Sequence, residues 1–247
     1  MLRGAILVFA GVVPVALASP GYTVERGIDL KQFDAEQIGL LEKLNRADRR
    51  HLARLPVVVV PDEWGLDELA YSPMPAYSEW AAQSGGKALI IDIPGQVFGA
   101  YEDGNLVRWG PISSGRKGNE TPAGLKHLSW RSRIRRSSID ETWIMEWYFN
   151  FDPRRGIAMH KYTLPGRPAS HACVRLLERD AMWIYNWGEL PRKGRRGTPV
   201  WLVGEYDFDA PPPWRAPEQL AERLAALGQT ADRVKPATEA AAGASPR

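Results

Sequence analysis

The chain has 247 residues, of which 44% are hydrophobic and 25% charged, which is enough apolar material for one substantial globular domain and a smaller module. Its net charge of +3 suits an acidic polymer such as cell wall. This charge is too small to indicate a nucleic-acid partner.

The first 18 residues have the pattern of a secretory signal peptide. Arg3 gives a positive start, Gly4 to Leu17 is apolar, and Ala16-Leu17-Ala18 is a small-x-small cleavage site. The apolar run is short for a bilayer span, so an uncleaved anchor is the less favoured alternative. We expect export to the periplasm or cell wall, with no integral membrane span after cleavage.

Residues 19–62 predict a small α+β module. Tyr22-Thr23-Val24 is strand-like, Ala35 to Leu44 has helical spacing of apolar residues, and Leu55 to Pro61 is a β-branched run closed by proline. With Gly27 and Leu30, this β-α-α-β pattern weakly resembles the LysM module, which implies peptidoglycan binding. The alternative is a helical arm against the main domain.

Residues 63–86 are rich in Pro, Ser, Gly and aromatics, which is typical of a linker or a wrapping loop. Strands dominate from Lys87, and the segment 87–206 is predicted to be the main domain. The expected strands are Ala88–Ile93, Gln96–Tyr101, Leu106–Ile112, Trp143–Phe151, Gly156–His160 and Gly197–Val203. With a helix over Glu178–Trp187, they predict a mainly β fold, either two packed sheets (a β-sandwich) or a flattened barrel, with one or two helices.

The C-terminal residues 207–247 are predicted to be a Pro-rich extension with a short amphipathic helix over Pro217–Leu227 and a disordered tail.

A basic cluster lies within the main domain, at Arg131, Arg133, Arg135 and Arg136. It predicts either a solvated hairpin face or a docking surface for substrate carboxylates.

The stretch Met159–Leu176 contains the residues best suited to chemistry. It holds the only cysteine, Cys173, and two of the four histidines, His160 and His171. In an exported protein a single cysteine is either buried and inert or kept for its reactivity. A reactive thiol needs a nearby base or positive charge, and both histidines are candidates. Zinc binding is a weaker alternative, because the spacing is not that of a zinc helix or knuckle.

Four ordered motifs carry a resemblance to a known family. They are Ser-Ser-Gly-x5-Thr-Pro-x-Gly at Ser113–Gly124, the upstream His160, Ser-His-Ala-Cys-Val-Arg-Leu at Ser170–Leu176, and Gly-Thr-Pro-Val at Gly197–Val200. From Lys87 to about Val203 the chain resembles the YkuD-type L,D-transpeptidase catalytic domain. The resemblance implies no metal and no cofactor.

The resemblance also implies residue roles. Cys173 is the nucleophile, His160 is the base, oriented by a backbone carbonyl, and His171 lies beside the thiol and shapes the oxyanion site. Backbone N–H groups of Ala172 and Cys173 are the implied oxyanion donors. The implied substrate and oxyanion residues are Ser170, Ala172, Arg175, Gly115 and Thr121.

The implied activity is that of a peptidoglycan L,D-transpeptidase. Cys173 would form a thioester with a stem peptide, release D-alanine and pass the acyl group to an amine, making a 3→3 cross-link. The alternatives are an L,D-carboxypeptidase or peptidoglycan hydrolase using the same site, and a non-catalytic wall-binding protein. The acyl acceptor and the oligomeric state stay open.

The sequence departs from the family pattern at two positions. Ala172 stands where the family has glycine, and an alanine there is strained if the backbone has positive φ. Lys161 follows His160 where small residues are common.

Overall fold

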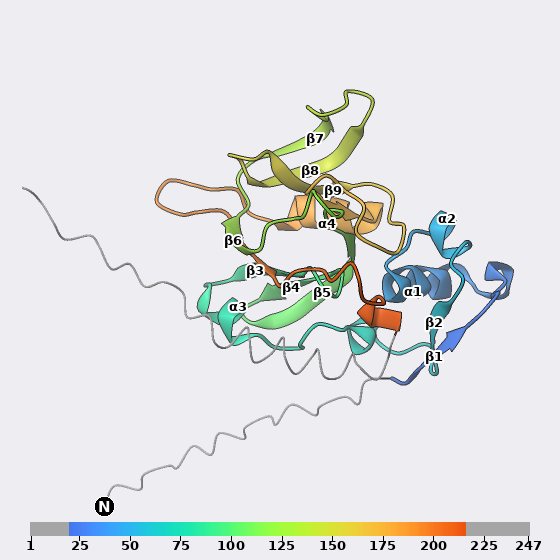
Figure 1. Cartoon of the computed structure of the whole chain (residues 1–247). Helices are drawn as coiled ribbons and strands as arrows, with labels where there is room; N and C mark the ends of the chain where they lie inside the picture. The colour runs from blue at the N-terminus through green and yellow to red at the C-terminus, as the bar shows by residue number, and fades with distance from the viewer. Residues whose placement is uncertain (1–19, 216–247) are drawn as a thin grey trace, which may run out of the picture.

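The computed structural model describes residues 20–215, which form one nine-stranded sheet, one two-stranded sheet and four α-helices (Figure 1). The strands are β1 (Tyr22–Glu25), β2 (Val58–Pro61), β3 (Lys87–Asp92), β4 (Val97–Glu102), β5 (Asn105–Ser113), β6 (Gly124–His127), β7 (Arg131–Arg136), β8 (Ile144–Asp152), β9 (Ile157–Lys161), β10 (Val174–Leu176) and β11 (Pro199–Val203). The helices are α1 (Ala35–Asn45), α2 (Arg49–Leu52), α3 (Glu79–Gln83) and α4 (Glu178–Trp187), with 3-10 turns η1 (Leu30–Gln32), η2 (Glu68–Tyr71) and η3 (Pro213–Arg215).

The large sheet has the order β6-β11-β3-β4-β5-β10-β9-β8-β7 and is curled (Figure 1). The predicted mainly β fold is therefore confirmed. The short strand β10 connects the two halves of this sheet, because it pairs antiparallel with β5 and parallel with β9. It thereby joins the β3–β5 meander to the β7–β9 strands in one continuous sheet.

The main core lies inside the curl, where α4 packs on β8 and β9. The predicted helix over Glu178–Trp187 has the same bounds as α4. Completely buried core residues include Leu89, Ile112 and Val174, from three different strands. Because close-packed interiors tolerate little displacement, this core fixes β9 and β10 against each other.

The N-terminal segment forms the predicted β-α-α-β unit. β1 and β2 pair antiparallel, and α1 begins at a capping box in which Asp34 accepts from the backbone of Gln37. The Asp48 side chain caps α2 by accepting from the backbone N–H of His51. Local capping and the β-branched strand therefore explain why these residues adopt this order of elements.

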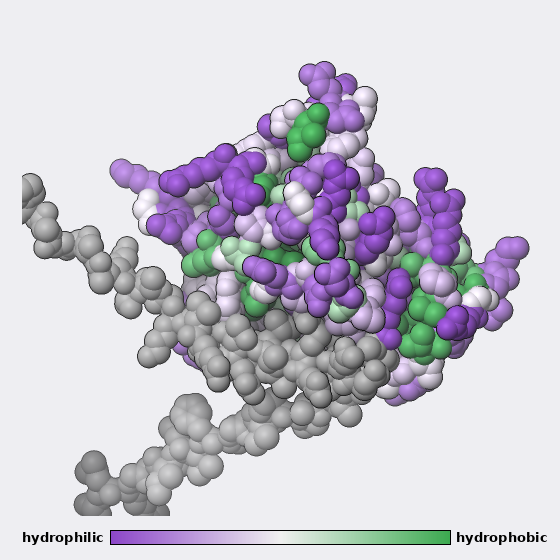
Figure 2. All heavy atoms as spheres, viewed as in Figure 1, coloured by the Kyte–Doolittle hydropathy of each residue, from purple (hydrophilic) through white to green (hydrophobic). Residues whose placement is uncertain are grey.

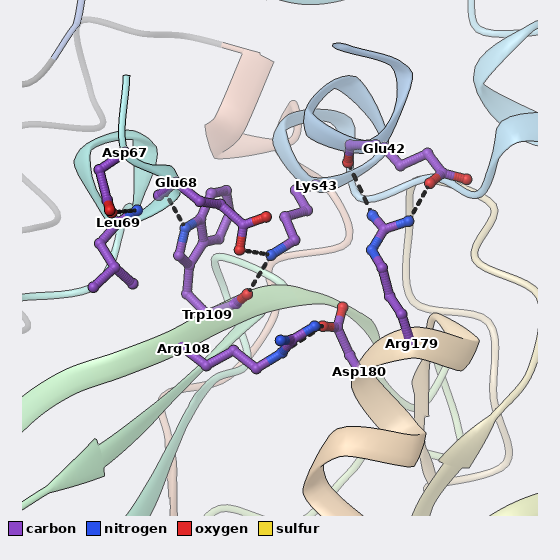
Figure 3. Close-up of polar contacts among 10 residues, drawn as sticks. Glu42, Lys43, Asp67, Glu68, Leu69, Arg108, Trp109, Arg179 and Asp180 are labelled. Carbon is purple, nitrogen blue, oxygen red and sulfur yellow. Dashed lines mark hydrogen bonds and ion pairs between the residues drawn. The ribbon is translucent and has the colours of Figure 1, made fainter. Parts of the chain in front are cut away.

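Helix α1 also binds the main domain through charged side chains (Figure 3). Glu42 accepts from Arg179 of α4 at 2.6 Å, and Lys43 Nζ donates to the Trp109 carbonyl oxygen of β5 at 2.9 Å. Lys43 also pairs with Glu68. These contacts are the ones expected if residues 19–62 form a helical arm that packs against the main domain.

Residues 63–86 lie against the main domain. Tyr71, Met74 and Trp80 are each 3% exposed and share a core cluster with β3, β4 and β5. Of the two interpretations of this segment, these contacts favour the wrapping loop over the linker. The short helix α3 lies here and was not expected from the sequence.

The basic cluster lies on β7, on the protruding hairpin formed with β8. The Arg133 guanidinium stacks 3.1 Å from the centre of the Trp147 ring, and Arg135 lies 4.9 Å from that of Trp130. These cation–π contacts favour a structural hairpin face over a docking surface for carboxylates. Ile134 and Ile139 are exposed in this hairpin region. Figure 2 shows a small hydrophobic spot among polar atoms at the upper end of the molecule, where the hairpin lies.

The expected signal peptide (1–18), C-terminal helix (217–227) and tail lie outside the described residues. From residue 20 to residue 215, no helix has the length and apolar character needed to cross a bilayer.

Candidate active site

Two neighbouring parallel strands bring Cys173 and His160 to one site. Cys173 immediately precedes β10, and the register of β10 with β9 places Arg175 opposite His160. Side chains alternate along a strand, so residues 173 and 175 project to the same face as His160. The thiol and the imidazole accordingly line the same pocket.

This pocket has a volume of about 50 Å³, which is enough for a reacting carbonyl group. The predicted residues that line it are Cys173, His160, His171, Ser170 and Arg175. The pocket residues that the sequence did not indicate are Ser137, Ile139, Trp143, Met145 and Tyr162. Four of these come from the connection between β7 and β8 and the start of β8, and only the tertiary fold brings that hairpin over the thiol.

The His160 ring is buried and held in one orientation. Its side chain is 5% exposed, and Nδ1 lies 2.9 Å from the backbone oxygen of Lys161, which is the carbonyl expected beside this ring. Because a carbonyl can only accept, Nδ1 carries the hydrogen and Nε2 keeps its lone pair. Burial lowers the pKa of His160 to about 4, and the Arg175 charge contributes in the same direction. The ring is therefore a neutral base at neutral pH.

Cys173 rests as a neutral thiol. Burial raises its pKa, while the Ala158 backbone N–H and the positive charge of Arg175 act in the opposite direction. A neutral thiol beside a neutral imidazole must lose its proton as it attacks. The same raised pKa slows oxidation of the thiol, because the thiolate is the form that reacts.

Hydrogen bonds behind the pocket fix the turn that carries Cys173. The Thr121 hydroxyl accepts from the Gly115 N–H at 2.8 Å and donates to the Ala172 carbonyl at 2.9 Å. The Ser170 hydroxyl donates to the Cys173 carbonyl. A Cβ at Gly115 would collide with the Asn119 carbonyl oxygen, so glycine is required there. Gly115 and Thr121 thus lie behind the turn and do not line the pocket.

Ala172 has φ of 82°, the left-handed conformation that makes an alanine strained. Such a residue costs about 1–3 kcal/mol. Its side chain is 8% exposed and packs in the main core, and its carbonyl is held by Thr121. Surrounding contacts therefore impose the conformation that a glycine would adopt freely.

The His171 ring lies between an aromatic ring and a guanidinium. Its centroid is 4.9 Å from that of Trp143, and its Nε2 is 2.7 Å from Nη2 of Arg116. Burial lowers the pKa of His171, and the charges of Arg116 and Arg175 lower it further.

The positive charge at this site comes from three arginines, Arg116, Arg167 and Arg175. Arg175 lies 4.5 Å from the centre of the Tyr162 ring, and its pKa is lowered first by burial and then by the neighbouring charges of Arg116 and Arg167. Among residues 20–215, no carboxylate forms a salt bridge with any of the three. A substrate with carboxylate groups would supply the missing negative charge.

Comparison with known proteins identifies the same segment. Residues 86–202 match the model of the YkuD family, described as the L,D-transpeptidase catalytic domain. The predicted resemblance is confirmed for this segment. No curated protein matches the chain.

Solved structures of L,D-transpeptidases are similar to part of the chain. One from Xylanimonas cellulosilytica is 29% identical, with a TM-score of 0.46 over 67% of this chain and 78% of the other. One from Stackebrandtia nassauensis is 23% identical (TM-score 0.43; 49% and 57% covered), and one from Mycobacterium smegmatis is 18% identical (0.42; 48% and 58%). The chain thus spans less than two thirds of the last two.

Proposed function

Because residues 86–202 match the YkuD domain, we propose that this protein is a peptidoglycan L,D-transpeptidase with Cys173 as its nucleophile. The observation that carries the proposal is the placement of Cys173 beside β9, where a buried neutral imidazole, His160, lines the same pocket. The positive charge around the thiol suits the carboxylates of a stem peptide.

The first half-reaction makes a thioester. The Cys173 sulfur attacks the carbonyl between the L-configured centre and the terminal D-alanine, and its proton passes to Nε2 of His160. Backbone N–H groups of Ala172 and Cys173 stabilise the oxyanion. Collapse of the tetrahedral intermediate breaks the C–N bond, and the His160 proton goes to the leaving amine of D-alanine.

The second half-reaction runs the same groups in reverse. An amine of a neighbouring stem peptide attacks the thioester carbonyl and gives its proton to His160. The thiolate leaves and recovers that proton, which regenerates Cys173 and completes a 3→3 cross-link. Water in place of the amine would give carboxypeptidase activity. The apolar side chains of Ile139 and Trp143 line the pocket and would favour transfer by limiting the access of water to the thioester.

The roles of the two histidines separate in a kinetic experiment. A carbapenem should acylate Cys173, with intact mass spectrometry following the adduct. His160→Ala removes the proton acceptor and should slow acylation far more than His171→Ala, which leaves that acceptor in place. Equal effects would mean that the base is assigned wrongly, and no adduct under conditions that acylate a related enzyme would count against the thioester mechanism.

Export and wall binding complete the proposal. Residues 1–18 would act as a signal peptide that directs the protein to the periplasm or cell wall, and residues 19–62 would bind glycan as a LysM-like module. A groove of about 290 Å³ beside α1, lined by Trp64, Gln37 and Glu68, offers the aromatic and polar side chains that a sugar needs. Its use is tested by Trp64→Ala in Cys173→Ala protein, which should lose affinity for isolated sacculi. Unchanged affinity would favour the structural arm.

A further inference from the structure

We infer that Arg116 is a positioning residue that fixes the tautomer of His171, so that this ring offers a hydrogen on Nδ1 to the active-site pocket. The function of this hydrogen rests on the proposed acyl transfer. The tautomer of His171 can be measured without that reaction. Arg116 occupies one of the variable positions of the Ser-Ser-Gly-x5-Thr-Pro motif.

The first step is the direction of the hydrogen bond between the two residues. Arg116 Nη2 and His171 Nε2 are 2.7 Å apart. A guanidinium has only donors and keeps its charge at every accessible pH. Nε2 must therefore accept, which leaves it without a hydrogen. The hydrogen of the neutral imidazole is then on Nδ1.

The second step is that this Nδ1 is available. It is buried, and it has no hydrogen-bond partner within the described part of the chain. Buried polar atoms normally have a partner, and His171 is one of the residues that line the pocket, so the unused donor on its ring indicates a group that arrives with the substrate. The ring lines the pocket together with Cys173 and is held against Trp143.

The third step is what this donor does during acyl transfer. As the Cys173 sulfur adds to the carbonyl, negative charge develops on the carbonyl oxygen, and a donor already in place stabilises it without reorganisation. The opposite tautomer would present a lone pair from Nδ1, which repels that oxygen. Arg116 acts through His171 and not on the reacting atoms.

The position of Arg116 makes the inference testable without unfolding the protein. Its side chain is exposed, while its backbone N–H donates separately to the Ser170 carbonyl at 3.0 Å. Removing the guanidinium therefore leaves the loop anchored. Lys117 is a matched control, because it is an exposed cation on the same loop whose partner is Asp209 at 3.3 Å.

The experiment is a two-bond ¹H–¹⁵N correlation spectrum of the full chain labelled at histidine, with the His171 signals assigned from a His171→Asn sample. Wild type should show a protonated Nδ1 and a bare Nε2. Arg116→Lys, which keeps a donor, should show the same pattern, as should Lys117→Met. Arg116→Met should move the hydrogen to Nε2. Its rate constant for acylation by a carbapenem should fall about 10- to 100-fold at unchanged apparent affinity, with Arg116→Lys close to wild type.

Two results would overturn the inference. One is a wild-type spectrum with the hydrogen on Nε2. The other is an Arg116→Met protein that acylates slowly although its tautomer is unchanged, which would mean that Arg116 acts on the substrate itself. The spectrum needs no turnover, so a protein without transpeptidase activity whose tautomer follows Arg116 would refute the proposed function alone.

Discussion

The Thr121 hydroxyl holds the turn that carries the nucleophile, and its removal should cost both stability and activity. It is the partner of two buried backbone groups, the Gly115 N–H and the Ala172 carbonyl, and the Thr121 side chain is 5% exposed. Thr121→Val keeps the shape and leaves both groups unsatisfied. At about 1–3 kcal/mol for each of the two groups, we expect a loss of about 2–6 kcal/mol in the free energy of unfolding.

Urea denaturation followed by tryptophan fluorescence measures this loss. Thr121→Ser is the control, since it keeps the hydroxyl and should lie within about 1 kcal/mol of wild type because only a methyl group is lost. Acylation of Cys173 should slow in the valine variant. The Ala172 carbonyl loses its hydrogen bond from residue 121, so the turn is no longer held in its positive-φ conformation. A Thr121→Val protein as stable as wild type would refute the claim that this hydroxyl fixes the turn.

Two further predictions concern buried charge. The pKa of His160 is lowered to about 4, so its base form persists as the pH falls, and the acylation rate should hold down to about pH 5 and drop near pH 4. An acidic midpoint near 6.5 would show that the ring is solvated. Asp180 is completely buried and is bound by Arg108 at 2.7 Å (Figure 3). Arg108→Met should therefore lower the free energy of unfolding by about 3–5 kcal/mol, because it leaves a buried carboxylate without its partner. Adding Asp180→Asn to the Arg108→Met protein should restore much of the lost stability. A loss under 1 kcal/mol in a denaturation experiment would contradict the assignment of an essential buried pair.

Elements with strong local signals were predictable from the sequence. The α4 helix was predicted with its observed bounds, and the β3–β5 meander follows from apolar strand segments, two of which are joined by the turn at Glu102-Asp103-Gly104-Asn105. The joining strand β10 was not predictable as such, because three residues give no periodicity. Its place in the sheet depends on pairing with β5 and β9, which are distant in sequence.

The residues of the candidate site also fall into those that the sequence indicated and those that it did not. Cys173 and His160 were indicated by residue type, and the strain at Ala172 followed from a glycine-like position, which the structure gives as φ of 82°. Trp143 and Arg116 were missed as contacts of His171, because their roles arise only when the β7–β8 hairpin and the loop after β5 close over the turn. An arginine in a variable motif position has no sequence signal that distinguishes it from a solvated cation.

The most direct test of the central claim is to incubate the purified protein with stem tetrapeptide donors and an amine acceptor, and to analyse both the products and the protein by mass spectrometry. The proposed mechanism predicts release of D-alanine, 3→3 cross-linked dimers and a tripeptide thioester on Cys173, all absent in Cys173→Ala. Cross-linked product from the Cys173→Ala protein, or an acyl group on any other residue of the wild type, would contradict it.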